Sequence, residues 1–455
     1  MLFRGNAEAT IREKIITKGY IKGIIGLPAN LFYGTGIPAC IVVIDKENAQ
    51  ARTGIFMIDA SKGFVKDGNK NRLRAQDLHK IVDAFTRQTE IARYSRMVPL
   101  AEIEKNDFNL NIPRYIDSSE PEDLHDIEAH LKGGIPNRDL DALADYWAVM
   151  PSVRAALFGK GDRDGYANPK VEPAEVKPTI MNHAEFVAFA KIVGGVFDGW
   201  RKAHIDRLKA IKVGDHPKAL IHDISEDLLT RFAKVPLIDK YDVYQHLMTY
   251  WAEVMQDDCY ILAQDGWAAA KVIRELARNA DGKFTEDPDI TIGRQKLKAE
   301  LIPPALLIAR FFAKEQAALE ALEAKAEEAA RAIDELDEEH GGEEGLLFEA
   351  KTDKGKLTAK SVKDGLKDVM GDKDAEEERK VLQSCLDLIE KEKEASDAAK
   401  AAKAALELKV VQKYPKLTDD EAKCLLIESK WLAAIETAID GEVDRVSQSL
   451  TGRMK

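Results

Sequence analysis

The sequence has little of what secreted, metal-dependent and membrane proteins use. Its four cysteines, Cys40, Cys259, Cys385 and Cys424, lie far apart, with no CxxC pair and no histidine placed to complete a zinc set. We expect them to be reduced thiols. No apolar run approaches the roughly 20 residues that span a bilayer, and the first residues contain no apolar core of a signal peptide. These absences favour a cytoplasmic protein without a disulfide, a metal site or a membrane contact.

The length and composition indicate a folded multidomain protein. The chain has 455 residues, enough for two or three domains, and 45% of them are hydrophobic. The net charge of −12 argues against a general nucleic-acid binder. Basic residues outnumber acidic ones by 18 to 13 over residues 1–117 but are outnumbered by 35 to 25 over residues 301–455. Any DNA contact is therefore expected near the N-terminal end.

The N-terminal part predicts a small α/β structure. Helical spacing over residues 7–18 ends at Gly19. Short β-branched runs at residues 21–27, 39–45 and 55–59 predict strands, the first two of them buried. The string LPANLFYGTGIP between the first two runs is a loop rich in Gly and Pro, with two adjacent aromatic residues.

Two more segments complete this part. Residues 61–74 carry five basic residues against one acidic residue and predict an exposed loop. A helix is expected over residues 76–85, and the string NDFNLNIPRYID predicts an extended tail. The linker-like string SSEPED follows, so the first domain is expected to span residues 1–117.

Residues 118–300 predict a helical middle domain. Residues 159–179 are expected to form a loop, and Asn182 and Glu185 have the spacing of a capping box that opens a long helix. Four tryptophans are expected to anchor the core: Trp147, Trp200, Trp251 and Trp267.

Residues 301–455 predict long paired helices. A second charged helix over residues 375–411 is expected to run antiparallel to a first one, with the turn-rich residues 341–371 between them. Thr418 and Glu421 form a capping-box pattern before a final helix. Apolar residues of the first helix recur in steps of three and four, as in the seam of a coiled coil: Leu319, Leu322, Ala326, Ala329, Ile333 and Leu336.

Strings spread over nearly the whole chain carry a family resemblance. In chain order they are LFRGNAEATIREKII, IIGLPANLFYGTGIPACIVVIDK, IFMIDASKGF, FNLNIPRYID, DLLTRF, YDVYQHLMTYWAEVMQDD, EEHGGEEGLL and DRVSQSLTGR. Together they resemble the modification subunits of type I restriction-modification systems, which transfer a methyl group from S-adenosylmethionine to N6 of adenine in DNA. LPANLFYGTGIP is a specific signal.

The resemblance implies that this chain lacks the residues that perform methyl transfer. In the family, a Gly-rich turn binds the cofactor, and an Asn-Pro-Pro-aromatic motif holds the amino group for in-line attack on the methyl group. No Asn-Pro-Pro occurs here. Pro303 and Pro304 indicate a helix start, and the glycines of residues 158–162 have no βαβ context. We expect no catalytic residue and no retained S-adenosylmethionine site.

The fold expected from the resemblance is mainly α with a small α/β part. Residues 21–27 and 39–45 correspond to the last two strands of a seven-stranded Rossmann-like sheet, which pair as an edge hairpin. Five strands would be missing, and an apolar edge and face would be exposed. The chain would then be the C-terminal portion of the subunit, from an internal start, a cloned fragment or a split gene. An upstream N-terminal methyltransferase fragment would be its companion.

In the family, the loop between these two strands faces the flipped adenine, and an aromatic ring can stack on the extruded base. The resemblance gives that role to Phe32 or Tyr33, with Gly34 and Gly36 shaping the loop. Alternatively, both rings pack the junction between strand and loop.

The basic segment contains the candidate phosphate contacts, because binding to any DNA sequence needs only cations along the backbone. A solvated basic loop is the alternative. In the tail, Asn109, Asn111 and Arg114 could contact the cofactor domain or DNA, but a structural tail that folds back over the sheet is preferred. The candidate phosphate contacts are Lys62, Lys66, Lys70, Arg72 and Arg74.

The resemblance also implies docking on the helices of the specificity subunit. An intramolecular hairpin is the alternative, and the two are compatible. The residues expected to dock are Leu319, Leu322, Ile333, Leu336, Trp431 and Leu432.

Two functions therefore stay open. The first is the C-terminal part of an N6-adenine methyltransferase that is inactive alone, with the specificity and restriction subunits and double-stranded DNA as partners. The second is a non-catalytic helical scaffold that binds a specificity subunit or DNA. A neighbouring upstream gene with the Gly-rich turn and the Asn-Pro-Pro-aromatic motif would favour the first.

Overall fold

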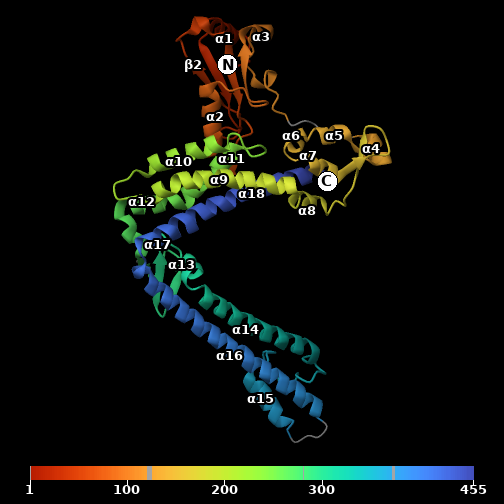
Figure 1. Cartoon of the computed structure of the whole chain (residues 1–455), viewed down its shortest axis with the longest axis vertical. Coiled ribbons are helices and arrows are strands. Elements are labelled where there is room, and N and C mark those ends of the chain that lie inside the picture. Colours follow the sequence, from red (N-terminus) through yellow and green to blue (C-terminus); the bar gives the residue numbers. More distant parts are fainter. Residues whose placement is uncertain (1, 120–125, 280, 371–374, 455) are drawn as a thin grey trace. The chain divides into compact units, whose positions relative to one another are not determined.

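The computed structural model describes residues 2–119, 126–279, 281–370 and 375–454 (Figure 1). The protein is mainly helical with a small mixed sheet near the N-terminus, as the sequence predicts. The chain forms two compact units. Unit 1 contains residues 1–207, 216–256 and 434–455, and unit 2 contains residues 208–215 and 257–433.

The N-terminal sheet of unit 1 has four strands in the order β2-β1-β3-β6. They are β1 (Ile21–Gly26), β2 (Cys40–Ile44), β3 (Gly54–Asp59) and β6 (Ser95–Pro99). β1 and β3 are parallel, whereas β2 and β6 run antiparallel to their neighbours. The three predicted strands and the antiparallel pairing of the first two are confirmed. β6 was not predicted, because its sequence SRMVP lacks a β-branched run.

Helices cover both faces of this sheet. They are α1 (Ala7–Thr17), α3 (Leu100–Lys105) and α2 (Ala75–Arg87). α1 and α3 pack on the face that buries Ile24 and Ile55, and α2 packs on the face that buries Ile25 and Phe56. Because the central strand β3 is covered on both faces, all six of its residues are buried.

β2 is not buried, contrary to the prediction. It lies at an edge of the sheet and pairs only with β1 among the described residues. Ile41 and Ile44 are 47% and 59% exposed. A β-branched run indicates a strand, but it does not indicate whether another element covers that strand.

Within residues 61–74, which the sequence predicts to be an exposed loop, residues 65–72 form a β-hairpin. β4 (Val65–Asp67) pairs antiparallel with β5 (Lys70–Arg72), so that Asp67 lies opposite Lys70. Gly68 has φ +60° in the connecting turn, where glycine is favoured. On β5, Asn71 is buried.

The tail after α3 folds back over the sheet, in agreement with the preferred structural alternative. It contains the 3₁₀ turn η2 (Ile112–Arg114). The backbone amide of Leu110 donates to the carbonyl of Leu2 (3.0 Å), and Arg12 Nε donates to the carbonyl of Phe108 (2.7 Å). Of the predicted linker, residues 118–123, the last four lie outside the described residues.

A helical layer forms the rest of the core of unit 1. Its helices are α9 (Ala184–Lys209), α10 (Pro217–Phe232), α11 (Lys240–Tyr250) with the π-helical η3 (Trp251–Met255), and α18 (Ala433–Met454). Trp147, Trp200 and Trp251 are buried, as predicted, whereas Trp267 in unit 2 is half-buried.

The predicted capping box of α9 is wrong, although the helix itself is present. Asn182 ends the preceding helix α8 (Val176–Met181), so it does not cap the next one. The carboxylate of Glu185 accepts a hydrogen bond from the backbone amide of Ser152 (2.8 Å). The Glu185 carboxylate, which the local pattern assigns to the cap of α9, therefore binds the amide of a residue distant in sequence.

Polar side chains join α2 to α10 and α11. His79 Nε2 lies 2.7 Å from the carboxylate of Glu226, and the Tyr241 hydroxyl donates to Asp83 (3.0 Å). Burial opposes ionisation of the Asp83 carboxyl, but the hydrogen bond from Tyr241 and the neighbouring basic side chains outweigh it. The pKa of Asp83 is therefore lowered.

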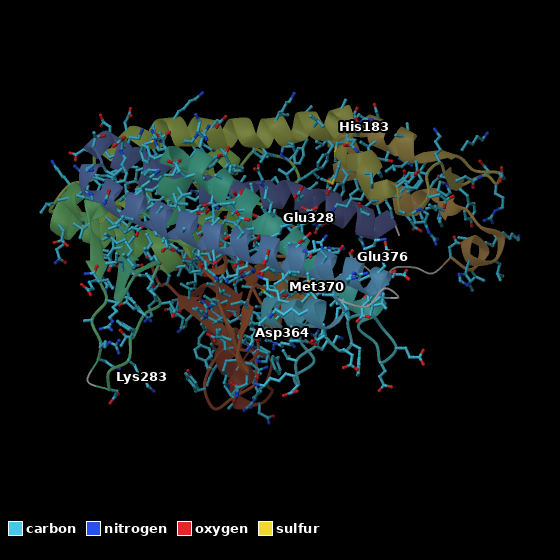
Figure 2. The ribbon with its side chains drawn as sticks, turned by 90° about the horizontal axis from the view of Figure 1, so that it is seen from below. His183, Lys283, Glu328, Asp364, Met370 and Glu376 are labelled. Carbon is cyan, nitrogen blue, oxygen red and sulfur yellow. The ribbon has the colours of Figure 1, made fainter. Side chains whose placement is uncertain are left out.

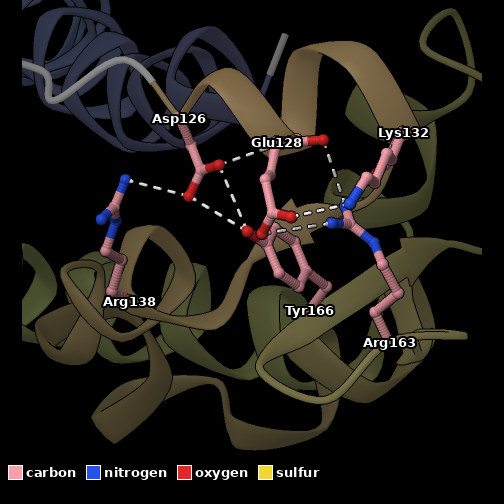
Figure 3. Close-up of polar contacts among 8 residues, drawn as sticks. Asp126, Glu128, Lys132, Arg138, Arg163 and Tyr166 are labelled. Carbon is pink, nitrogen blue, oxygen red and sulfur yellow. Dashed lines mark hydrogen bonds and ion pairs between the residues drawn. The ribbon is translucent and has the colours of Figure 1, made fainter.

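A second sheet of unit 1 has the order β7-β9-β8. It consists of β7 (Ile135–Pro136), β8 (Phe158–Lys160) and β9 (Tyr166–Pro169), surrounded by α4 (Ile127–Lys132), α5 (Asn137–Asp141), α6 (Ala144–Val149), α7 (Pro151–Leu157) and α8. Residues 159–179 are thus not a plain loop. Figure 3 shows how Asp126 fixes α4: its carboxylate accepts from the Ala129 amide (2.9 Å) and lies 3.2 Å from the Tyr166 hydroxyl.

Unit 2 contains a third small sheet, with the order β10-β12-β11. Its strands are β10 (Ile273–Glu275), β11 (Ile290–Ile292) and β12 (Gln295–Ala299). Figure 2 shows Lys283 at the tip of the loop between β10 and β11. The helices are α12 (Gln256–Asp265), α13 (Pro304–Phe311), α14 (Ala313–His340), α15 (Ala359–Asp368), α16 (Glu376–Lys413) and α17 (Asp419–Lys423) with the π-helical η6 (Cys424–Leu432).

The paired helices of unit 2 agree with the prediction. Lys409, late in α16, forms an ion pair with Glu315, early in α14 (3.0 Å), so the two helices run antiparallel. The predicted capping box of Thr418 and Glu421 is present, and Pro304 begins α13. α15 was not predicted in the turn-rich segment. It buries Val362 against the end of the hairpin.

A buried polar cluster holds α12 to η6 within unit 2. One carboxylate oxygen of Asp258 accepts from Lys430 Nζ (2.6 Å) and from Trp431 Nε1 (2.7 Å). Lys430 Nζ also donates to the Leu301 carbonyl (2.8 Å). Burial raises the pKa of Asp258, against the opposing effect of these donors.

Candidate functional site

The loop between β1 and β2, residues 28–38, carries two exposed aromatic rings. Tyr33 is 93% exposed and Phe32 is 50% exposed. Gly34 follows at φ +79°, a left-handed conformation that disfavours other residues. A Cβ at Gly36 would lie 3.0 Å from the side-chain oxygen of Asn30. The two glycines thus allow a tight turn behind Tyr33. We call residues 28–38 the aromatic loop.

The hairpin β4–β5 lies directly against the aromatic loop. Lys70 Nζ donates to the carbonyl of Phe32 (2.9 Å) and lies 5.9 Å from the ring centroid of Tyr33. The Asn71 amide donates to the carbonyl of Asn30 (3.0 Å). The two features that the sequence predicts separately, an aromatic loop and a basic segment, therefore form one surface.

The five candidate cations of the basic segment differ in their partners. Arg74 is neutralised by the buried carboxylate of Asp77, whose hydrogen bond raises the pKa of Arg74. Arg72 forms an exposed ion pair with Asp67 (3.1 Å), a kind of pair that water weakens. Lys62 donates to the carbonyl of Ser118.

Lys66 and Lys70 form no ion pair with a carboxylate among the described residues. Lys62 forms none there either, but its ammonium donates to the Ser118 carbonyl. Lys66 Nζ lies 5.7 Å from the ring centroid of Phe64. Lys70 contacts a carbonyl and a ring, as described above. Charges that no carboxylate neutralises attract phosphate most strongly. Of the cations that no carboxylate neutralises, Lys66 and Lys70 lie on the hairpin β4–β5 that contacts the aromatic loop, so they are the two principal candidates.

The sequence did not point to Asn71, although Asn71 joins the hairpin to the loop. Its side chain is 5% exposed, and Nδ2 donates to the carbonyl of Ala29 (2.7 Å). The available signal was one neutral residue between Lys70 and Arg72 in an otherwise charged string. That signal is weak, because asparagine is also common in turns.

The edge of the sheet beside the aromatic loop is open and apolar. Ile41 lies opposite Ile25 in the register, so its side chain is on the face that α2 covers. On α2 itself, Leu78 and Val82 are exposed. The outer edge of β2, which pairs with no strand in the part of the chain that the structure describes, also presents backbone donors and acceptors. The exposed apolar edge that the resemblance implies is present.

Contacts within the chain fill the carboxyl ends of the parallel strands β1 and β3. Ligands of Rossmann-like sheets bind at the carboxyl ends of parallel strands. There, Asp59 already accepts from the Ser61 amide (3.1 Å) and the Ser118 hydroxyl (2.6 Å). A Cβ at Gly26 would meet Ile112 at 2.8 Å. The groups at these strand ends are therefore engaged with other parts of the chain.

The predicted docking residues have different surroundings in unit 2. Leu319 is buried against α16, whereas Leu322, Ile333 and Leu336 are half-buried. Trp431 and Leu432 are buried at 0% and 1% exposure. These two side chains fill the interior of unit 2, so they are not available to a partner in this structure.

A groove runs between α14 and α16. Its cavity volume is about 560 Å³. Its lining includes small residues of both helices, among them Ala329, Ala332 and Ala395, together with charged residues such as Lys325 and Glu394. Small residues allow the close approach of another helix, and an intramolecular pair of helices thereby leaves room for a third.

Neither a membrane segment nor a metal site emerges from the described residues. None of their helices combines the length and apolarity that crossing a bilayer requires. No group of three or more histidine, cysteine, aspartate or glutamate side chains among them is placed to hold a metal ion.

Known proteins resemble the part of the chain that contains the sheet and the aromatic loop. Residues 1–124 match the family model of the N-6 DNA Methylase family. The type I restriction enzyme MjaVII methylase subunit of Methanocaldococcus jannaschii is 38% identical over 135 residues, which cover 29% of this chain and 23% of that protein. The MpnII methylase subunit of Mycoplasma pneumoniae is 31% identical over 145 residues, covering 32% and 25%.

A solved structure matches a similar share of the chain. It is the type I restriction-modification system methyltransferase subunit from Streptococcus thermophilus, with 42% identity over 26% of this chain and 25% of that chain, and a TM-score of 0.25. The chain spans about a quarter of the length of the curated relatives that it matches.

Residues 1–124 thus resemble the N-6 DNA methylase family. The two relatives described above are methylase subunits of type I restriction enzymes.

Proposed function

We propose that this chain supplies the target-base loop, a DNA contact and a subunit-docking surface to an adenine-N6 DNA methyltransferase of the type I restriction class. The observation that carries the proposal is the contact between the aromatic loop and the basic hairpin β4–β5, in which Lys70 Nζ lies 5.9 Å from the ring centroid of Tyr33. An exposed aromatic ring can stack on an extruded base, and the adjacent cations can bind the flanking phosphates. The ring with the greater exposure, Tyr33, is the proposed stacking residue.

We further propose that methyl transfer needs a companion polypeptide that binds S-adenosylmethionine. The support is the open, apolar edge at β2 together with the filled ends of β1 and β3. A strand of the companion would pair with β2 and cover Ile41 and Val82. Such pairing uses the unpaired backbone groups of the edge and buries apolar surface at the same time.

DNA binding tests the aromatic and basic surface. We expect this chain to bind duplex DNA with an affinity that falls as salt rises, and Lys66→Met and Lys70→Met should each lower the slope of log Kobs against log salt by about 0.9. Arg74→Met should change the slope less, because Asp77 already neutralises that cation. Lys354→Met, at an exposed lysine of unit 2, is the matched charge control. Equal slopes for all variants would contradict the proposal.

Calorimetry and a methylation assay test the requirement for a companion. We expect the chain alone to show no micromolar binding of S-adenosylmethionine. Labelled methyl groups should enter duplex DNA only when the companion is added. Micromolar binding of S-adenosylmethionine by this chain alone would contradict the proposed requirement for a companion. If the assembled mixture binds DNA and the specificity subunit but transfers no methyl group, the non-catalytic scaffold is the better description.

The groove between α14 and α16 is the proposed docking surface for a helix of the specificity subunit. By family, the restriction subunit would join the same complex. Ala332→Arg and Ala395→Arg place charge in the groove and should abolish co-purification with the specificity subunit. Ala404→Arg, on an exposed part of α16, is the matched control. Co-purification that survives both groove substitutions would exclude this surface.

A further inference from the structure

The aromatic loop is held mainly by donors from β5. Three of its carbonyl groups, those of Ala29, Asn30 and Phe32, accept hydrogen bonds from Asn71 Nδ2, the Asn71 amide and Lys70 Nζ at 2.7, 3.0 and 2.9 Å. Within the loop, the bond from the Asn30 amide to the Gly36 carbonyl is longer, at 3.4 Å. The position of the loop therefore depends on two adjacent residues of a hairpin about 40 positions away in the sequence.

The orientation of the Asn71 side chain follows from its surroundings. The side chain is 5% exposed, and Oδ1 has no hydrogen-bond partner among the described residues. A rotated amide would place Oδ1 against the Ala29 carbonyl, so that two acceptors would meet. The NH2 group must therefore face Ala29. A buried acceptor without a partner is tolerated because the opposite orientation would leave two groups unsatisfied.

We propose that Asn71 is a positioning residue of the aromatic loop, which it fixes through the bond from Nδ2 to the Ala29 carbonyl so that Tyr33 is presented at the surface. This inference rests on the proposed function, in which Tyr33 faces the target base. Asn71 carries no charge and is buried, so it acts through the loop and not through contact with DNA. Lys70 has both roles, because it anchors the Phe32 carbonyl and carries a charge that faces solvent.

The isosteric substitution Asn71→Asp gives a test with a pH signature. At neutral pH the introduced carboxylate would face the Ala29 carbonyl without a donor, and the loop should detach. Burial raises the pKa of a carboxyl group, so mild acid should protonate it. The protonated group can donate to Ala29 and restore the loop.

The measurement is amide hydrogen exchange of peptides that cover residues 28–38 and 68–74, corrected for the intrinsic rate at each pH. We expect Asn71→Asp to lose protection at least tenfold at pH 7.5 and to regain it near pH 5. Asn71→Ala should lose this protection at both pH values, whereas the wild-type protein should keep it at both. Lys70→Met, at a half-buried residue whose ammonium contacts the Phe32 carbonyl and the Tyr33 ring, should lose part of this protection. Wild-type protection in both Asn71 variants, or no recovery of Asn71→Asp in acid, would overturn the inference.

DNA binding separates this inference from the proposed function. Asn71→Ala should weaken DNA binding five- to tenfold without changing the salt slope, because no charge is lost, whereas Lys70→Met should change both. If Asn71→Ala frees the loop but binds DNA like wild type, the positioning role stands and the role of the loop in DNA binding is rejected. If the loop keeps its protection in Asn71→Ala, the positioning role is rejected whatever the DNA result.

Discussion

The buried cluster of Asp258, Lys430 and Trp431 makes a prediction about the stability of unit 2. Asp258→Ala leaves the Lys430 ammonium, whose side chain is 14% exposed, without its carboxylate. Removing one partner of a buried ion pair costs about 3–5 kcal/mol. We expect a loss of that size. Trp431→Phe removes one hydrogen bond to a charged acceptor and should cost about 1.5–3 kcal/mol from that bond, together with any cavity term.

A double variant distinguishes the isolated charge from simple loss of packing. Lys430→Met in an Asp258→Leu background removes both charges, so the cost of the double variant should fall to about 1–3 kcal/mol, because the groups that lose a partner, among them the Trp431 N–H and the Leu301 carbonyl, are uncharged. The raised pKa of Asp258 supports this expectation, since it shows that burial of the carboxylate outweighs the help from its donors.

Urea titration followed by hydrogen exchange of peptides from α12 and η6 reports on unit 2 alone. Such a local probe is needed because two units need not unfold in one transition. An effect of Asp258→Ala below about 1 kcal/mol, or a double variant less stable than Asp258→Ala, would refute the reasoning about an isolated buried charge.

Three further predictions concern other parts of the fold. Gly19 has φ +66°, and a Cβ there would lie 2.1 Å from a backbone oxygen, so Gly19→Ala should lower the free energy of unfolding by about 3 kcal/mol or more. Gly68 has φ +60° in open space, so Gly68→Ala should lower it by only about 1 kcal/mol. Thermal unfolding of the two variants compares these losses. Because the pKa of Asp83 is lowered, the Asp83 carboxylate stabilises the fold above pH 3.8, the ordinary pKa, and this stabilisation is lost as the pH falls below that value. The stability of Asp83→Asn should therefore depend less on pH in that range, as measured by acid titration. A titration curve identical to that of the wild type would contradict this prediction. Tyr414 is fully buried and donates to the Ile302 carbonyl (2.6 Å), so Tyr414→Phe should cost about 1–3 kcal/mol in urea, and no change would show that water replaces the bond.

Local sequence patterns predicted helices and strands correctly where the hydrophobic pattern of one segment is enough to define its secondary structure. The β-branched runs became β1, β2 and β3, and the apolar steps of α14 became a packed antiparallel pair. The same patterns failed where burial depends on which distant element lies opposite. Ile41 and Trp431 are both apolar residues of predicted elements, yet one is exposed at a sheet edge and the other is fully buried.

Polar residues were harder to assign, because their partners are remote. Glu185 had the spacing of a capping group, but its carboxylate binds the amide of Ser152, which comes from another helix. Similarly, the number of charges in residues 61–74 does not show which of the five cations can bind phosphate. Only pairing in space shows that Asp77 neutralises Arg74, while Lys66 and Lys70 keep their charges available.

The candidate site illustrates why composition alone misses a binding surface. An aromatic loop and a basic segment, separated by some 30 residues, become one surface because β5 donates hydrogen bonds to the carbonyl groups of the loop. The donors are Asn71, which is uncharged and buried, and Lys70, whose charged ammonium donates to the backbone carbonyl of Phe32. A variant that keeps the net charge, Asn71→Ala, should therefore perturb DNA binding, whereas loss of the charge of Arg74 should matter less. Charge counting predicts the opposite order, so the two substitutions decide between composition and geometry.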